Sequence, residues 1–163
     1  MESILSSYSF DILGNLGNEA LIVTRDDEVF ALGSNGAGCL GLGDMHSTLA
    51  PKQVEPLCYK VDLRGINIHL PLETFLLQKV VGFAYGSGPH VLAYTESGEL
   101  YSWGHNGYCQ LGNGSTNQGL TPAIIQNSLL GRKVVQVVFF SIRFYPYICL
   151  NDRLHVEAII LCV

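Results

Sequence analysis

The sequence predicts an all-β fold of antiparallel strands, and three observations support this. Glycine supplies 18 of the 163 residues, which indicates many tight turns and therefore short strands. Short apolar runs end in turn residues, and the repeated part contains no convincing amphipathic helix. The chain is 48% hydrophobic and 14% charged, a balance typical of sequences that form a core.

The strands are predicted from apolar and β-branched runs that are separated by turns. Gly98 is well placed to take a positive φ in one hairpin loop, and Asp27 does so less comfortably in the other. A single helical turn is predicted after Pro71. The predicted strands are Glu19–Thr24, 29–32, 79–84, His90–Thr95, 100–103 and 133–137.

An internal repeat organises these strands. Residues 21–51 align with residues 92–122 without a gap, at an offset of 71 positions and with eleven identities. The identical pairs are Leu21/Leu92, Thr24/Thr95, Glu28/Glu99, Gly33/Gly104, Asn35/Asn106, Gly36/Gly107, Leu40/Leu111, Gly41/Gly112, Gly43/Gly114, Leu49/Leu120 and Pro51/Pro122.

The underlying repeat unit is shorter than this offset. Val80-Val81 and Val134-Val135 recur 54 residues apart, so the first copy contains an insertion of 17 residues, placed within 58–78. A unit of 54 residues is near the period of propeller blades. We therefore expect a partial β-propeller of about two blades plus part of a third. The predicted organisation is an N-terminal extension at 1–16, the repeats at 17–137 and a divergent apolar tail at 138–163.

Charge and cysteine content exclude several classes of function. The net charge is −5 and the only basic cluster is Arg132-Lys133, so we expect no direct binding of nucleic acid. Five scattered cysteines without a C-x-x-C pair predict free thiols in a reducing compartment, with neither a disulfide framework nor a zinc site.

The two ends of the chain predict neither secretion nor a membrane span. The N-terminus has no basic region followed by an apolar core, and charged residues interrupt the apolar C-terminal stretch. The predicted location is intracellular, in the nucleus, the cytoplasm or both.

The second copy carries a specific motif at residues 103–114, W-G-H-N-G-Y-C-Q-L-G-N-G, and residues 33–43 are its weaker first copy. This motif resembles the signature of the regulator-of-chromosome-condensation repeat, which implies a β-propeller. The residues that carry the resemblance are Gly33, Asn35, Gly36, Leu40, Gly41 and Gly43, and Trp103, Gly104, Asn106, Gly107, Gln110, Leu111, Gly112 and Gly114.

Within this family, residues 85–92 and the W-G-H-N-G-Y stretch look most like the members that also carry a BTB domain. That resemblance implies an adaptor that presents clients to a cullin-type ubiquitin ligase, although this chain has no BTB segment. The pattern is lost after Val137, since Phe140 stands where the turn glycine belongs and Phe144 where a histidine does. The insertion is equally unlike the family loop.

Motifs for catalysis or cofactor binding are explained better as structure. Residues 36–41 match G-x-G-x-x-G, but alternating glycines cannot begin the helix that a dinucleotide site requires, so we expect a blade turn. His90 is expected to be a buried histidine that bonds to nearby backbone. No metal spacing and no catalytic triad motif occurs, so no catalytic, cofactor or metal residue is predicted. The candidate partner contacts are His105 and Tyr108, whereas Trp103 is expected in the core.

The predicted function is a non-catalytic protein-interaction module with a protein partner and no small-molecule substrate. One alternative is guanine-nucleotide exchange or chromatin docking, as the founding member of the family implies. A second alternative is a truncated product without independent function, because an open propeller exposes apolar faces and strand edges.

Overall fold

The computed structural model describes residues 8–9, 18–58, 79–86, 89–125, 133–139, 146–150 and 156–158. Throughout this part the chain forms strands and loops, together with a short 3-10 helix, η1 (Glu55–Leu57). The prediction of an all-β fold is confirmed. The predicted helical turn after Pro71 and nearly all of the inserted segment lie outside the described residues.

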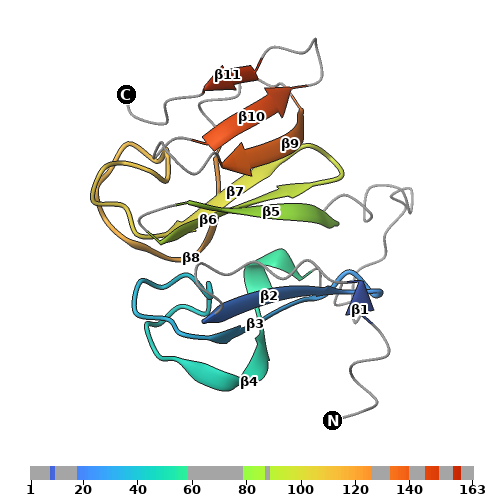
Figure 1. The fold of residues 1–163 in the computed structure, drawn as a ribbon, viewed down its shortest axis with the longest axis vertical. Coiled ribbons are helices and arrows are strands. Elements are labelled where there is room, and N and C mark those ends of the chain that lie inside the picture. The colour runs from blue at the N-terminus through green and yellow to red at the C-terminus, as the bar shows by residue number, and fades with distance from the viewer. Residues whose placement is uncertain are drawn as a thin grey trace, which may run out of the picture.

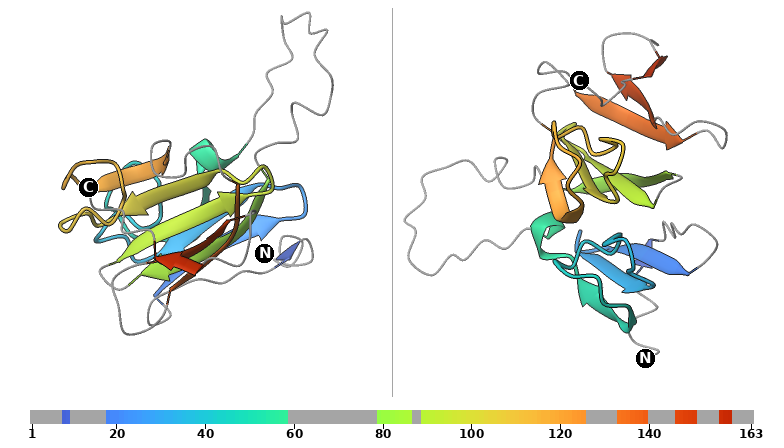
Figure 2. Two further views of the ribbon diagram at one scale, coloured as in Figure 1. Left: turned by 90° about the horizontal axis from the view of Figure 1, so that it is seen from above. Right: turned by 90° about the vertical axis from the view of Figure 1, so that its left-hand side faces the viewer.

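The described strands form three antiparallel sheets, which follow one another along the longest axis of the molecule (Figure 1). The right-hand view of Figure 2 also shows the second sheet between the first and the third. The first sheet contains β1 (Tyr8–Ser9), β2 (Glu19–Thr24), β3 (Val29–Gly33) and β4 (Thr48–Gln53). The second contains β5 (Val80–Gly86), β6 (His90–Thr95), β7 (Leu100–Gly104) and β8 (Gly119–Ile124), and the third contains β9 (Val134–Phe139), β10 (Pro146–Leu150) and β11 (Val156–Ala158).

The first two sheets have the same strand register. Glu19 lies opposite Gly33 between β2 and β3, and His90 lies opposite Gly104 between β6 and β7. The β3–β4 and β7–β8 pairs also match, each with an irregularity just before the glycine that ends the inner strand of the pair. The repeat in the sequence is therefore a repeat of whole sheets.

The predicted strands agree closely with those observed. Glu19–Thr24 and His90–Thr95 have the predicted bounds, and 29–32 and 100–103 each extend by one glycine. Asp27 and Gly98 both have the positive φ expected in the hairpin loops, 59° and 89°. Strands β1, β4, β8, β10 and β11 are additional to those predicted, and β10 and β11 extend the third sheet beyond residue 137.

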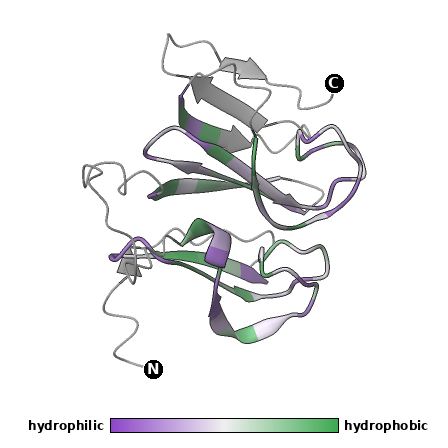
Figure 3. Cartoon of the chain, turned by 180° about the vertical axis from the view of Figure 1, so that it is seen from behind, coloured by the Kyte–Doolittle hydropathy of each residue, from purple (hydrophilic) through white to green (hydrophobic). Residues whose placement is uncertain are grey.

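The core lies between the sheets. One face of the second sheet packs on the first, where Val91, Ala93 and Trp103 share a cluster with Leu21 and residues around it. Alternate residues of the second sheet form another cluster with Val134 and Val137 of β9. The second sheet is thus buried on both faces, and nearly every residue of β6 and β7 is buried. Figure 3 shows hydrophobic stretches on strands of the first two sheets.

Candidate protein-interaction surface

Each repeat has a long loop after its third strand, and a glycine begins it. Gly33 and Gly104 have φ values of 111° and 102°. A Cβ atom at Gly104 would lie 2.7 Å from the carbonyl oxygen of Pro89, and one at Gly33 would meet the carbonyl oxygen of Asn18 even more closely. The next amides donate to the same two carbonyls, Ser34 to Asn18 at 2.8 Å and His105 to Pro89 at 2.9 Å. Only glycine fits where the chain leaves the sheet this closely.

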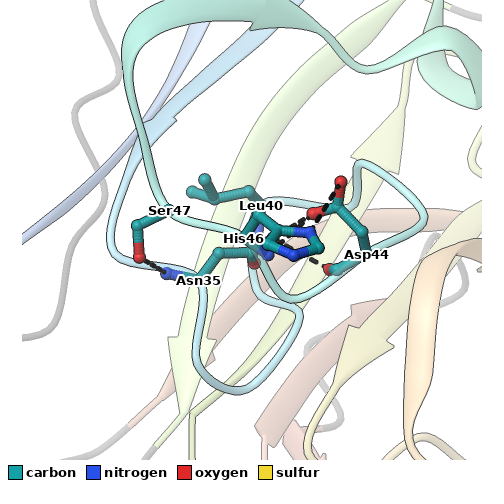
Figure 4. Close-up of polar contacts among 5 residues, drawn as sticks. All are labelled: Asn35, Leu40, Asp44, His46 and Ser47. Carbon is teal, nitrogen blue, oxygen red and sulfur yellow. Dashed lines mark hydrogen bonds and ion pairs between the residues drawn. The ribbon is translucent and has the colours of Figure 1, made fainter.

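A buried asparagine then holds each loop together. The Oδ1 atom of Asn35 accepts a hydrogen bond from the Leu40 amide at 2.9 Å, and its Nδ2 atom donates to the Asp44 carbonyl at 2.9 Å (Figure 4). Asn106 does the same with the Leu111 amide at 3.0 Å and the Ser115 carbonyl at 2.8 Å. Both asparagine side chains are buried, as are Leu40 and Leu111, which fill the space beneath the loops.

The backbones of the two loops have the same shape. Positive φ values recur at the same repeat positions even though one glycine has been replaced by cysteine. Gly36 and Gly107 also occupy equivalent exposed positions. The φ values are 71°, 69° and 85° at Gly38, Gly41 and Gly43, and 59°, 63° and 70° at Cys109, Gly112 and Gly114.

The first loop is a contact between sheets. The indole Nε1 of Trp103 donates to the Cys39 carbonyl at 2.7 Å, and the Gly43 amide donates to the Leu120 carbonyl at 2.9 Å. Trp103 is fully buried, with its ring edge-on to Phe83 at a centroid distance of 6.5 Å. Trp103 therefore lies in the core as predicted and ties the second sheet to the first loop.

The second loop, by contrast, presents an aromatic side chain to solvent. Tyr108 is 73% exposed, whereas Ala37 stands at its position in the first loop and is half-buried against the core. The Gln110 side chain supports this loop, because its Oε1 accepts from the Tyr108 amide at 2.8 Å and its Nε2 lies 3.1 Å from Nδ1 of His105. The rings of His105 and Tyr108 are 6.4 Å apart, so the two predicted contact residues lie together.

The titratable groups near the loops have structural explanations. A hydrogen bond from the His46 amide holds the pKa of the Asp44 carboxyl below its ordinary value (Figure 4). Burial raises the pKa of the Cys39 thiol, whose Sγ lies 3.5 Å from the Tyr85 hydroxyl. His90 is fully buried in β6, as expected, and its bond to nearby backbone stays a prediction.

The two loops have few of the side chains that bind phosphate or metal ions. The segments 33–51 and 104–122 contain no lysine or arginine. Residues 36–41 form the tight loop that leads to β4, and no helix follows them, so the G-x-G-x-x-G match is a blade turn as expected. Within the described ranges there is no metal-binding group of three or more His, Cys, Asp or Glu side chains. The same part of the chain has no helix long and apolar enough to cross a membrane.

Sequence reasoning found the glycines but missed the contacts between sheets. The identical pairs Leu49/Leu120 and Pro51/Pro122 in the repeat alignment were the sequence feature that could have indicated these contacts. In the structure Pro122 lies against Gly41, and Leu120 lies against Gly38.

Comparison with known sequences gives matches over most of the chain. The family model described as "Regulator of chromosome condensation (RCC1) repeat" matches residues 26–61 and 97–139. The chain is 33% identical over 127 residues to "Protein RCC2 homolog" of Danio rerio, covering 77% of this chain and 21% of that protein. It is also 33% identical over 105 residues to "Ultraviolet-B receptor UVR8" of Arabidopsis thaliana, covering 64% and 20%. The chain thus spans about a fifth of the length of these relatives.

Solved structures give the same picture of the fold. The crystal structure of human WBSCR16 aligns with a TM-score of 0.56 and 25% identity, over 80% of this chain and 28% of that one. Prp20p from Saccharomyces cerevisiae aligns with a TM-score of 0.52 and 19% identity, over 74% and 26%. These neighbours are β-propellers, so the stacked sheets are propeller blades and the prediction of a partial β-propeller is confirmed.

Proposed function

Because the chain belongs to the family of RCC1-repeat proteins, we propose that it is a non-catalytic protein-interaction module that binds its partner through the loop after β7. The contact residues in this proposal are Tyr108 and His105. The assignment to the BTB-containing subgroup stays a prediction. In such a protein the same loop would select the clients of a cullin-type ligase.

The observation that carries the proposal is an exposed tyrosine on a well-supported loop. Tyr108 is 73% exposed, while its loop is fixed by Asn106 from within and by Gln110 beside it. Tyrosine side chains on ordered loops supply contact area at a small entropic cost, and they are enriched among residues that dominate binding energy. A solvent-exposed tyrosine at a position where the first repeat has alanine therefore favours a binding role.

The binding surface extends over both repeats. The loops after β3 and β7 lie on the same side of the stack (Figures 1 and 2). Met45 of the first loop is 48% exposed. The two segments 33–51 and 104–122 contain one aspartate, Asp44, and no glutamate, lysine or arginine. A surface of this kind suits a partner with apolar and hydrogen-bonding groups more than a polyanion.

The test is affinity capture with matched variants of the full chain. Tyr108→Ala removes the exposed ring, and Val81→Ala removes an exposed apolar side chain from β5 as a control. A true partner, identified by mass spectrometry, is retained by the wild type and Val81→Ala and binds Tyr108→Ala at least about tenfold more weakly. Equal retention of every captured protein by Tyr108→Ala contradicts the proposal.

A second assay separates this function from nucleotide exchange. Prp20p, one of the structural neighbours, is described as binding Gsp1p and histones, so Gsp1p loaded with a fluorescent nucleotide is a suitable probe. An interaction module is expected to cause no acceleration of nucleotide release. Accelerated release, lost on mutation of the loops, would favour exchange. We propose an intracellular location, where such protein partners are available.

A further inference from the structure

The loops after β3 and β7 contain three asparagine–glycine pairs, Asn35-Gly36, Asn106-Gly107 and Asn113-Gly114. Such pairs are prone to lose the side-chain amide as ammonia, because glycine has no side chain to shield its own amide nitrogen from the asparagine carbonyl carbon. The first two asparagines are buried, whereas Asn113 and Gly114 are both exposed. Three pairs with the same local chemistry therefore lie in different surroundings.

The fold holds the two buried asparagine side chains by both of their polar atoms. Nδ2 of Asn106, the atom that would leave as ammonia, donates to the carbonyls of Ser115 at 2.8 Å and Asn117 at 2.9 Å. Its Oδ1 accepts from the Leu111 amide at 3.0 Å. Asn35 makes the same two kinds of contact in the first loop. A reaction at either side chain would break buried hydrogen bonds, so the fold protects both pairs.

The exposed Asn113 side chain is held by its oxygen, on which three donors converge. Its Oδ1 accepts from the Ser115 amide at 3.1 Å, from the Ser115 hydroxyl at 3.0 Å and from Nδ2 of Asn106 at 3.2 Å. Donors placed around a carbonyl oxygen stabilise the negative charge that develops there when a nucleophile adds to the carbon. Apart from its two chain neighbours, nothing lies within 4 Å of a Cβ position at Gly114, so there is space for a ring to close.

We propose that Asn113 is a site of spontaneous deamidation, which the loop after β7 promotes without an enzyme. The Gly114 amide nitrogen attacks Cγ of Asn113 and gives up its proton to water. The bond between Cγ and Nδ2 breaks, Nδ2 takes up a proton and leaves as ammonia, and a cyclic succinimide remains. Water then opens the ring at either of its carbonyl carbons and gives aspartate or isoaspartate. Water is consumed and ammonia is released in equal amounts, and nothing is oxidised or reduced.

The reaction changes the charge of this loop. Segment 104–122 contains no aspartate, glutamate, lysine or arginine, so the product carboxylate is the first in it. The donors around Oδ1 of Asn113 also suit a carboxylate oxygen, so aspartate can keep the hydrogen bonds of the loop. Isoaspartate instead lengthens the backbone before Gly114 by one carbon atom. The inference is independent of partner binding through Tyr108, because the reaction requires no partner.

The test is a time course of the folded full chain in mildly alkaline buffer. Samples are digested under acidic conditions, where the reaction is slow, and peptide mass spectrometry locates the gain of mass that accompanies conversion of an amide to a carboxylate. Asn113 is expected to convert at least about tenfold faster than Asn35 or Asn106. The chain unfolded in urea is the reference, and there all three asparagines are expected to convert at similar rates.

Two variants separate the effect of the donors from the effect of exposure. Ser115→Ala removes the hydroxyl donor, and it is expected to slow conversion of Asn113 about two- to tenfold in the folded chain and to have no effect in urea. Thr116→Ala removes an exposed hydroxyl at the next position, and it is expected to leave the rate unchanged. Circular dichroism checks that both variants remain folded.

Three results would overturn the proposal. The first is an intact Asn113 in the folded chain under conditions in which the unfolded chain reacts. The second is conversion of all three asparagines at equal rates in the folded chain. The third is a folded Ser115→Ala variant that converts as fast as the wild type, because exposure alone would then explain the reaction.

Discussion

At the scale of single residues, Asn35 and Asn106 satisfy polar backbone groups that the loops would otherwise bury. Each side chain accepts from one amide and donates to carbonyls of the same loop. A buried donor without an acceptor costs about 1–3 kcal/mol. One buried asparagine side chain per repeat therefore stabilises its loop more than several exposed polar residues do.

The first prediction concerns Asn106→Ala. This substitution leaves the buried Leu111 amide and the carbonyls of Ser115 and Asn117 without their partner. The free energy of unfolding, measured by urea denaturation, is expected to fall by about 3 kcal/mol. Asn117→Ala is the control, because its side chain is exposed, and it is expected to change stability by less than about 0.5 kcal/mol. Equal effects of the two variants would contradict this role for Asn106.

The second prediction concerns Cys109, which holds a φ of 59° where the first repeat has Gly38. A residue with a Cβ atom is destabilised by about 1–2 kcal/mol in this conformation, and glycine avoids this strain. The larger conformational entropy of glycine in the unfolded chain offsets part of that gain. Cys109→Gly is therefore expected to stabilise the chain by about 0.5–1 kcal/mol in thermal or urea unfolding. A loss of stability would mean that the loop does not hold this shape.

The third prediction concerns alkaline pH. Burial, with smaller contributions from Glu99, raises the pKa of Tyr101 to about 12. The folded chain therefore holds the phenol proton more tightly than the unfolded chain does. The resulting stability is present below about pH 10 and is lost as the pH rises from about 10 toward 12. Melting temperatures measured from about pH 8 to 11 are expected to fall less steeply for Tyr101→Phe than for the wild type, and parallel curves would contradict this.

At the scale of secondary structure, the strands that sequence could predict are those with buried side chains. β2, β6 and β7 carry apolar runs because they face other sheets. β4 and β8 are mostly exposed edge strands, and each contains a proline, so they lack the alternation that marks a strand. Their positions follow only from pairing with β3 and β7.

The fourth prediction tests the loop that joins the first two sheets. A Cβ atom at Gly41, where φ is 69°, would lie 3.0 Å from Pro122 and 3.1 Å from Trp103. Gly41→Ala is expected to cost about 2–4 kcal/mol and to shift the emission of Trp103 to longer wavelength. Gly36→Ala is the matched control, because apart from its two chain neighbours nothing lies within 4 Å of its Cβ position, and it is expected to change neither quantity.

At the scale of the whole molecule, the chain is a stack of sheets. The repeat could be predicted from the sequence, whereas the contacts between the sheets could not. Glycines recur because the backbone requires them at each loop, and this local rule gives a visible period. The hydrogen bond from Trp103 to Cys39 joins residues far apart in the sequence, so no local sequence pattern predicts it. The exposure of Tyr108 and Leu49 depends equally on which neighbouring sheet is present.

The central claim is that the second sheet packs on the first loop through Trp103, the only tryptophan of the chain. Its indole proton gives one resolved signal in a proton NMR spectrum, so its neighbours and its exchange with water can be measured directly. We expect nuclear Overhauser effects from this proton to Cys39 and Gly41, together with slow exchange. A rapidly exchanging indole proton without contacts to the first loop would contradict the stacked-blade arrangement.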